Sequence, residues 1–239
     1  MKVRLYVHHD LSEGASLPLG ETHDHYLRHV LRRQLNDTVF LFNGRDGEWQ
    51  SHIHSLDKKG GALLVESRAR EQSVAVPLGL AFALIKRSPC EWMIEKASEL
   101  GVTELWPLTM QRSAVHDANI ARLQAIATES AEQCGRLDVP VVHPVQSLEK
   151  FLKTAPTGQS IFFAAESGQA RPLRDVMNMQ PALFLIGPEG GFSEQEHVLL
   201  RRIDQVIPIS LGRNILRAET AALTCLALRC CGDDGIKIK

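Results

Sequence analysis

Two stretches near the C-terminal end of the chain each have the pattern of a buried strand, a glycine-bearing loop and the start of a helix. Residues 182–196 read Ala-Leu-Phe-Leu-Ile-Gly-Pro-Glu-Gly-Gly-Phe-Ser-Glu-Gln-Glu, and residues 207–221 read Ile-Pro-Ile-Ser-Leu-Gly-Arg-Asn-Ile-Leu-Arg-Ala-Glu-Thr-Ala. Such strand–loop–helix units are typical of parallel α/β sheets. Because open α/β sheets bind small molecules at the carboxyl ends of their strands, both loops are candidate ligand-binding loops. For the first loop alone, a connection that binds no ligand is the alternative.

Local details of the loops strengthen the ligand-binding interpretation. Ser193 and Glu196 have the spacing of a capping box, which predicts that a helix begins there. Gly190 and Gly191 can adopt positive φ and let backbone N–H groups approach a ligand. The second loop gathers polar chemistry at another strand end: Gly212, Arg213, Arg217, Glu219 and Thr220.

Residues 1–72 carry short apolar runs separated by turn signals, a pattern typical of a compact β-barrel. We expect strands at Arg4–Val7, Thr38–Phe42, Glu48–Leu56 and Ala62–Glu66. Residues 23–34 have helical periodicity, which places Arg28, Arg32 and Arg33 on one outer face. That face is a candidate phosphate-binding surface, and a merely solvated charged helix is the alternative.

Histidine and cysteine usage argues against a metal site. His25 and His29 lie four residues apart on the predicted helix, a spacing that suits a metal ion. No cysteine or further carboxylate completes a recognisable ligand set, so we interpret the histidines as solvated or phosphate-facing. The five cysteines are odd in number and lack C-x-x-C spacing, which disfavours zinc or a disulfide framework and favours a reducing, cytoplasmic setting.

From residue 73 onward, strands alternate with helices, which is the signature of a parallel sheet. Before the two glycine loops we expect strands at Leu78–Ile85, Glu104–Leu108, Val141–Val142 and Ile161–Ala165. We expect helices at Ser88–Leu100, with Ser88 as its N-cap, and at Asn119–Cys134, Leu148–Leu152 and Ala218–Cys231. Apolar residues wrap much of the last helix, which indicates burial on several sides, in the core or at a subunit interface.

Charge and hydropathy restrict the partners. The net charge of −1 at pH 7 gives no global basic field, so any RNA binding must come from local patches. The N-terminal segment lacks the apolar region of a signal peptide, and no run approaches the ~20 apolar residues that a membrane helix needs. We therefore expect a soluble cytoplasmic protein with no membrane partner.

The residue order in the two glycine loops is specific. Ile-Gly-Pro-Glu-Gly-Gly-Phe at 186–192, followed by Leu-Gly-x-x-Ile-Leu-Arg-x-Glu-Thr-Ala at 211–221, resembles the knotted (SPOUT-class) RNA methyltransferases, and within them the ribosomal RNA small subunit methyltransferase E family. Shorter matches extend the resemblance nearly end to end: His-Tyr-Leu-Arg-His-Val-Leu-Arg at 25–32, Lys86, Lys-Ala-Ser-Glu-Leu-Gly-Val at 96–102, Arg112-Ser113 and Glu132-Gln-x-x-Arg136. Arg122-Leu123 departs mildly from the Arg-Trp that the family often carries.

The resemblance implies an α/β fold with two domains. Residues 1–72 would form a PUA-like β-barrel that binds RNA, and residues 73–239 a SPOUT-like α/β-knot domain with a parallel sheet. The implied reaction transfers a methyl group from S-adenosyl-L-methionine to N3 of a uridine in small-subunit (16S) rRNA, supplied as free RNA or as the assembled 30S subunit. The resemblance also implies a homodimer to which the last helix contributes.

Candidate site residues follow from the resemblance and from side-chain chemistry. For the cofactor they are Leu185, Ile186, Gly187, Gly190, Gly191, Leu211, Gly212, Ile215, Leu216, Arg217 and Thr220. Arg217 could stabilise negative charge on the uracil oxygens. Glu189 or Glu219 could accept the N3 proton, or could instead cap a helix or pair with Arg217. Candidates for RNA binding, where guanidinium forks suit phosphates, are Arg4, Arg28, Arg32, Arg33, Arg45, Lys86, Arg112 and Arg136.

Two other function classes stay open from the residues alone. A nucleotide-phosphate hydrolase could use residues 187–191 as a phosphate cradle, although no Gly-Lys-Ser/Thr follows and Glu189 would repel phosphate. A non-catalytic RNA-binding module could retain the same fold as a scaffold. The preference for a methyltransferase rests on the resemblance rather than on the fold pattern.

Overall fold

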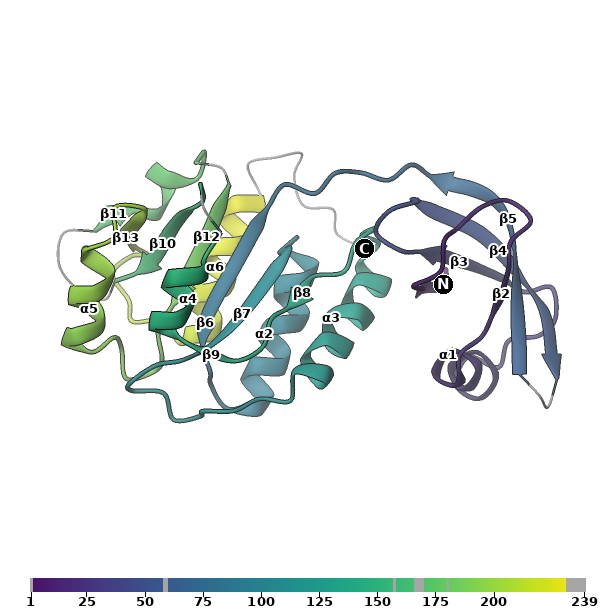
Figure 1. The fold of residues 1–239 in the computed structure, drawn as a ribbon, viewed down its shortest axis with the longest axis horizontal. Helices are drawn as coiled ribbons and strands as arrows, with labels where there is room; N and C mark the ends of the chain where they lie inside the picture. Colours follow the sequence, from purple (N-terminus) through teal and green to yellow (C-terminus); the bar gives the residue numbers. More distant parts are fainter. Residues whose placement is uncertain (1, 58–59, 157, 166–169, 180, 231–239) are drawn as a thin grey trace. The chain divides into compact units, whose positions relative to one another are not determined.

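The computed structural model divides the chain into two compact units (Figure 1). Unit 1 contains Met1–Val74 and Ala131–Val139, and unit 2 contains Ala75–Ser130 and Pro140–Lys239. The residues that the structure describes are 2–57, 60–156, 158–165, 170–179 and 181–230. Unit 1 is therefore built from two separate segments of the chain.

Unit 1 is organised around a five-stranded sheet with the strand order β1-β3-β4-β5-β2. Its strands are β1 (Arg4–Tyr6), β2 (Ser16–Pro18), β3 (Thr38–Phe42), β4 (Glu48–Asp57) and β5 (Gly60–Arg70). Strand β1 pairs in parallel with β3, and the other ladders are antiparallel. The alternating side chains of these strands meet in an apolar core that includes Leu5, Leu41, Ile53 and Leu63. The predicted strands are confirmed, whereas the three-residue β2 is too short to give a pattern of its own.

The helical segment of unit 1 is shorter than its periodicity predicts. Helix α1 (Glu21–His25) continues as the π-helix η1 (Tyr26–Val30), and then Arg32 adopts a positive φ of 50°. The backbone N–H of Arg33 donates to the carbonyl of Leu27 over 2.8 Å, so the chain closes the end of the helix through the left-handed Arg32. The prediction of one helix through residue 34 is therefore wrong. Arg32 and Arg33 do not share a helical face with Arg28.

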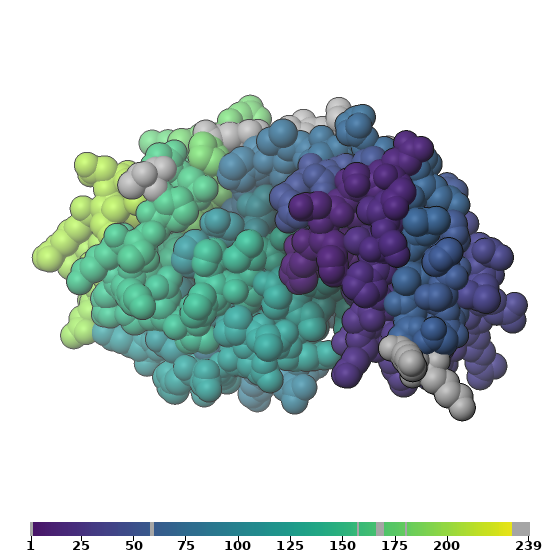
Figure 2. Space-filling model, turned by 45° about the vertical axis from the view of Figure 1, so that its right-hand side comes forward, coloured from purple at the N-terminus to yellow at the C-terminus, as the bar shows by residue number. Residues whose placement is uncertain are grey.

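The second segment of unit 1 is fixed by polar and apolar contacts. The guanidinium of Arg4 donates to the carbonyls of Ala131, Glu132 and Arg136 over 2.7–3.0 Å. Buried Phe42 packs in a small cluster with Ala131 and Leu137. In the space-filling view, the N-terminal residues (purple) lie against the blue surface of the same unit (Figure 2). Residues 131–139 thus complete the core of the N-terminal unit.

Unit 2 is built on an eight-stranded parallel sheet. Its strands are β6 (Leu78–Ala83), β7 (Glu104–Thr109), β8 (Val141–Val142), β9 (Gln146–Ser147), β10 (Ser160–Ala164), β11 (Arg171–Pro172), β12 (Ala182–Ile186) and β13 (Val206–Ser210). The order is β11-β13-β10-β12-β6-β7-β8, and β9 also pairs with β7. Every pairing is parallel, as the alternation of strands and helices predicts.

Helices cover both faces of this sheet (Figure 1). They are α2 (Arg87–Glu99), α3 (Ile120–Cys134), α4 (Leu148–Thr154), α5 (Glu194–Arg201) and α6 (Ala218–Cys230), with a 3₁₀ turn η2 (Leu173–Val176). On β12, Phe184 and Ile186 pack in the cluster that contains α2, α3 and α6, whereas Leu183 and Leu185 pack in the cluster that contains α4 and α5. Burial on both faces explains why the central strands are apolar at nearly every position.

Helix termini test the capping predictions. Ser193 is the N-cap of α5 and forms the predicted capping box with Glu196. Helix α2 begins one residue before Ser88 and has Lys86 as its N-cap, without a side-chain cap, so the predicted Ser88 cap is wrong. Cys231, where the last helix was expected to end, lies outside the described residues.

Candidate active site

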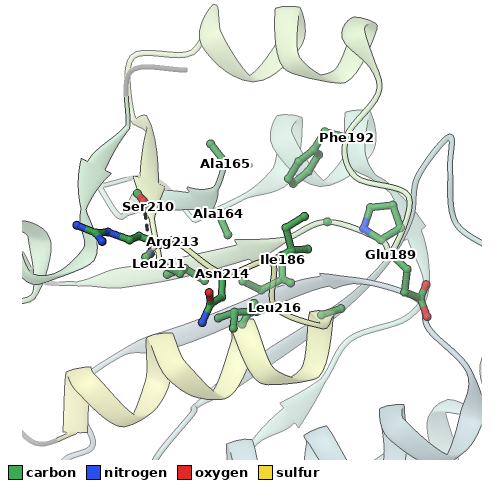
Figure 3. Close-up of a pocket in the computed structure, with 16 residues that line it drawn as sticks. Ala164, Ala165, Ile186, Glu189, Phe192, Ser210, Leu211, Arg213, Asn214 and Leu216 are labelled. Atoms are coloured by element: carbon green, nitrogen blue, oxygen red, sulfur yellow. Dashed lines mark hydrogen bonds between the residues drawn. The ribbon is translucent and has the colours of Figure 1, made fainter. Parts of the chain in front are cut away.

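An open cavity of about 170 Å³ lies at the carboxyl ends of β10, β12 and β13, three neighbouring strands of the parallel sheet (Figure 3). The chain leaves each strand there in a loop, and the start of α6 closes the cavity from another side. The lining residues are Ala164, Ala165, Ile186, Gly187, Pro188, Glu189, Phe192, Ser210, Leu211, Gly212, Arg213, Asn214, Ile215, Leu216, Ala218 and Ala221. The two glycine loops singled out from the sequence therefore meet in one cavity.

The first loop is a tight turn between β12 and α5. The N–H of Gly191 donates to the carbonyl of Pro188 over 2.9 Å, and Gly191 has a φ of 69°. A side chain at this position would be strained, so the turn requires glycine. Gly190 does not adopt positive φ, contrary to the expectation for both glycines. Its requirement is spatial, because a Cβ there would lie 3.3 Å from Cβ of Arg112.

The second loop contributes both apolar and polar groups. Ile186, Leu211 and Leu216 gather between the strand ends and α6 in the close-up, together with the amide of Asn214 (Figure 3). Ile215 lines the rim with 94% of its surface exposed. Its side chain is therefore open to solvent beside the cavity.

Six of the predicted cofactor residues line the cavity, namely Ile186, Gly187, Leu211, Gly212, Ile215 and Leu216. The other five predicted cofactor residues do not line the cavity, although each is adjacent in sequence to a residue that does. They are Leu185, Gly190, Gly191, Arg217 and Thr220. Leu185 is fully buried on the α4–α5 face of the sheet. The residue patterns missed Ala164, the last residue of β10, and Ala165, which follows it, because only the strand order brings them to the cavity.

The three candidate catalytic residues differ in position. Glu189 lines the cavity, with its carboxylate pointing away from the other labelled residues (Figure 3). Arg217 is exposed and Glu219 is half-buried at the start of α6. Within the described part of the chain, neither makes an ion pair, so the anticipated pairing of Arg217 with a glutamate is absent there.

The candidate RNA-binding residues differ in how exposed their side chains are and in what they contact. Arg4 and Arg136 are engaged inside unit 1: Arg4 bonds to Glu48 and to three carbonyls, and Arg136 pairs with Asp138 over 2.7 Å. Arg28 is half-buried and pairs with Asp24. The side chains of Arg32, Arg45 and Lys86 are exposed, and Arg45 pairs with the exposed Asp10 over 2.7 Å. The side chain of Arg33 is half-buried, and Arg112 contacts the first glycine loop. Surface position thus favours Arg32, Arg45 and Lys86 as phosphate contacts.

The described residues contain neither a candidate metal-ligand cluster nor a helix that could cross a membrane. No group of three or more histidine, cysteine, aspartate or glutamate side chains in these residues could hold a metal ion. The ring centroids of His25 and His29 lie 5.0 Å apart, and no third ligand side chain among the described residues completes a site with them. None of the helices within the same ranges is long and apolar enough to cross a membrane.

Comparison with known proteins defines the class first. Residues 72–229 match the family model of the RNA methyltransferase domain, and residues 25–66 match the RNA methyltransferase PUA domain. The predicted fold class, a parallel α/β domain preceded by a PUA-like domain, is confirmed. The fold and the matched domains are those of an RNA methyltransferase.

The particular family follows from individual relatives. The chain is 32% identical to the ribosomal RNA small subunit methyltransferase E of Rickettsia conorii, over 94% of this chain and 93% of the relative, and 31% identical to that of Synechocystis, over 95% and 77%. The crystal structure of the Neisseria gonorrhoeae enzyme bound to S-adenosyl methionine superimposes with a TM-score of 0.84 at 26% identity, covering 95% of this chain and 96% of that one. The chain belongs to the ribosomal RNA small subunit methyltransferase E family.

Proposed function

We propose that this chain transfers a methyl group from S-adenosyl-L-methionine to N3 of a uridine in small-subunit (16S) rRNA. The observation that carries the proposal is the cavity at three parallel strand ends, formed largely by the two loops whose sequences match the family. Family membership supplies the substrate class, and the relative from Neisseria gonorrhoeae supplies the cofactor.

The lining of the cavity fits the cofactor. Ile186, Leu211 and Leu216 offer apolar walls for an adenine ring, while a Cβ on Gly212 would meet nothing within 4 Å, so its backbone is open on that side. Gly187 leaves room for the ring of Phe192, which lies 2.9 Å from the position of a Cβ there. The side chains of Ser210 and Asn214 add polar partners for the ribose or the amino-acid part. We propose that these residues hold S-adenosyl-L-methionine, with Gly190, Gly191 and Thr220 supporting the loops around it.

The cofactor supplies an activated methyl group on a sulfonium, so the protein's task is mainly alignment of the reacting groups. Uridine N3 carries a proton that must leave when the methyl group arrives. Glu189 is our choice for accepting it, because Glu189 lines the cavity whereas Glu219 does not. This role requires the Glu189 side chain to turn toward the base, since its carboxylate points away from the other labelled lining residues (Figure 3). The exposed guanidinium of Arg217 is available to stabilise negative charge on the uracil oxygens.

We further propose a division of labour and an assembly. Residues 1–72 bind the rRNA through Arg32 and Arg45, with Lys86 adding a contact from residues 73–239, which perform the transfer. Trp92 and Leu228 are each 47% exposed on α2 and α6, helices that pack together, and large exposed apolar side chains favour a homodimer interface there. The setting is the cytoplasm, and the substrate is rRNA within the 30S subunit or before its assembly.

Nucleoside mass analysis of 16S rRNA tests the proposal. Purified protein is incubated with S-adenosylmethionine and rRNA or 30S subunits from cells that lack it, and one uridine should gain a methyl group at N3. A melting-temperature series with S-adenosylhomocysteine, ATP and neither tests the competing classes, because only a bound ligand raises the melting temperature. Stabilisation by ATP alone would favour the hydrolase, and stabilisation by neither would favour the non-catalytic module.

A further inference from the structure

Arg112 lies in the turn after β7 and holds the first glycine loop from outside the cavity. Its Nη1 donates to the carbonyl of Gly190 over 3.0 Å and to the carbonyl of Phe192 over 3.3 Å. The aliphatic part of the Arg112 side chain packs closely against Gly190. A Cβ on that glycine would lie only 3.3 Å from Cβ of Arg112. One side chain thus grips both ends of the Gly190–Phe192 segment.

A second set of bonds joins the same two loops. The N–H of Gln111 donates to Oε1 of Glu196 over 2.9 Å, while Oε2 of Glu196 accepts from the N–H of Ser193 over 2.8 Å. Glu196 is only 4% exposed, so its carboxylate is a buried bridge between the turn after β7 and the start of α5. Buried charge-assisted hydrogen bonds of this kind hold geometry tightly.

The turn that carries Arg112 is itself fixed. The N–H of Met110 donates to Oγ of the buried Ser113 over 3.1 Å, and the N–H of Ser113 donates back to the carbonyl of Met110 over 3.1 Å. Arg112 therefore projects from a rigid base. The segment that it grips contains Gly191, with its positive φ, and Phe192, whose ring lines the cavity and packs against Gly187.

We propose that Arg112 is a positioning residue that preorganises the Pro188–Phe192 loop for the cofactor, independently of RNA. This inference rests on the proposed function. The sequence suggested instead that Arg112 contacts the RNA backbone. The two roles separate cleanly, because a positioning role weakens cofactor binding when no RNA is present, whereas a phosphate contact changes only RNA binding and its salt dependence.

Calorimetry with S-adenosylhomocysteine in the absence of RNA provides the main test. We expect Arg112→Ala to weaken binding about tenfold through the lost preorganisation, and Arg112→Lys to recover part of the loss. In assays, KM for S-adenosylmethionine should rise while kcat changes little, the signature of lost ground-state binding. Arg87→Ala, which removes an exposed arginine from α2, is the matched control and should bind as the wild type does.

A double-mutant cycle keeps the test decisive if Arg112→Ala alters stability. Gly190→Ala is allowed by its backbone but would place a Cβ 3.3 Å from Cβ and 3.6 Å from Cδ of Arg112, so it should weaken binding when Arg112 is present. Beside Arg112→Gly, which removes both of these atoms, it should cause little further loss. Additive losses, or wild-type affinity in Arg112→Ala with a flatter salt dependence of RNA binding, would overturn the positioning role. A wild-type protein that does not bind S-adenosylhomocysteine would instead defeat the proposed function.

Discussion

Arg4 donates its Nε hydrogen to Oε1 of Glu48 over 2.6 Å in the interior of unit 1, where Glu48 has no exposed surface. Lys2 and Arg70 donate to the same carboxylate over 2.7–3.0 Å. Burial raises the pKa of Glu48, but the hydrogen bonds from Arg70, Lys2 and Arg4 outweigh it and lower the pKa to about 2. Three cations, those of Lys2, Arg4 and Arg70, therefore share one buried carboxylate on β4.

Glu48→Gln should destabilise unit 1 by about 3 kcal/mol, because removing one member of a buried ion pair leaves the other charges uncompensated. Denaturant unfolding followed by tryptophan fluorescence measures the change. Glu71→Gln, which alters an exposed glutamate of the same unit, is the matched control and should cost little. Equal stabilities of the two variants would contradict the role of Glu48.

The same carboxylate makes stability depend on pH. Its folded-state pKa of about 2 lies below the ordinary value of 4.5, so its contribution is complete above pH 4.5 and is lost as the pH falls toward 2. The gap in unfolding free energy between the wild type and Glu48→Gln should narrow over that range. A gap that stays constant between pH 5 and pH 2.5 would refute the assignment.

Ile215→Ala should weaken S-adenosylhomocysteine binding about fivefold and leave the melting temperature of the free protein unchanged. The side chain is almost fully exposed without ligand, and its covered apolar surface contributes about 1 kcal/mol on binding. Val198→Ala, on α5 and outside the cavity lining, serves as the control. A loss of stability without a loss of affinity would show that Ile215 supports the fold rather than the ligand.

Replacing Arg32 and Arg45 together with glutamine should reduce the salt dependence of rRNA binding. Each lost phosphate contact lowers the slope of log K against log salt concentration by about 0.7–0.9. Filter binding at several salt concentrations measures this slope. Replacing Arg171 and Arg174, two exposed arginines of unit 2, with glutamine removes the same net charge and is the control. An unaltered slope would show that Arg32 and Arg45 do not contact RNA phosphates.

Leu228→Asp should convert a homodimer into a monomer without unfolding the chain. Leu228 is half exposed in the single chain, so the new carboxylate stays solvated there, whereas a dimer interface would bury it unpaired and weaken association. Light scattering compares the mass of each sample with the chain mass of 26.5 kDa. Val198→Asp, another exposed apolar position, should leave the dimer intact. A wild type that remains at the mass of one chain at high concentration and is active contradicts the assembly.

Patterns within one segment predicted most of the fold. The strand at Thr38–Phe42, the capping box of Ser193 and the parallel sheet of unit 2 all follow from local periodicity and turn chemistry. The end of the helix near Arg32 could not be predicted in this way. There the helix ends at a single residue with positive φ, and the apolar pattern of the sequence continues past it. The helix Ala218–Cys230 likewise hid which of its leucines face outward: Leu226 is fully buried and Leu228 is not.

The site was only partly predictable for a related reason. The glycine loops can be recognised from the sequence. Ala164 and Ala165, in contrast, reach the cavity only because β10 lies between β12 and β13. Leu185 and Ile186 are equally apolar, and the sequence does not reveal which face of a doubly covered strand meets a ligand. Arg4 resembled a surface cation because its carbonyl partners lie 127 or more residues away in the chain.

The two-segment construction of unit 1 restricts how this chain can be recombined. A cut near residue 74 separates the N-terminal strands from residues 131–139, whose carbonyls accept from Arg4 and Arg70. In a chimera that takes only residues 1–74 from a relative, residues 131–139 still come from this chain. Where the two segments do not match, the hydrogen bonds between them are lost. To transfer unit 1 intact, both segments, residues 1–74 and residues 131–139, have to be exchanged together.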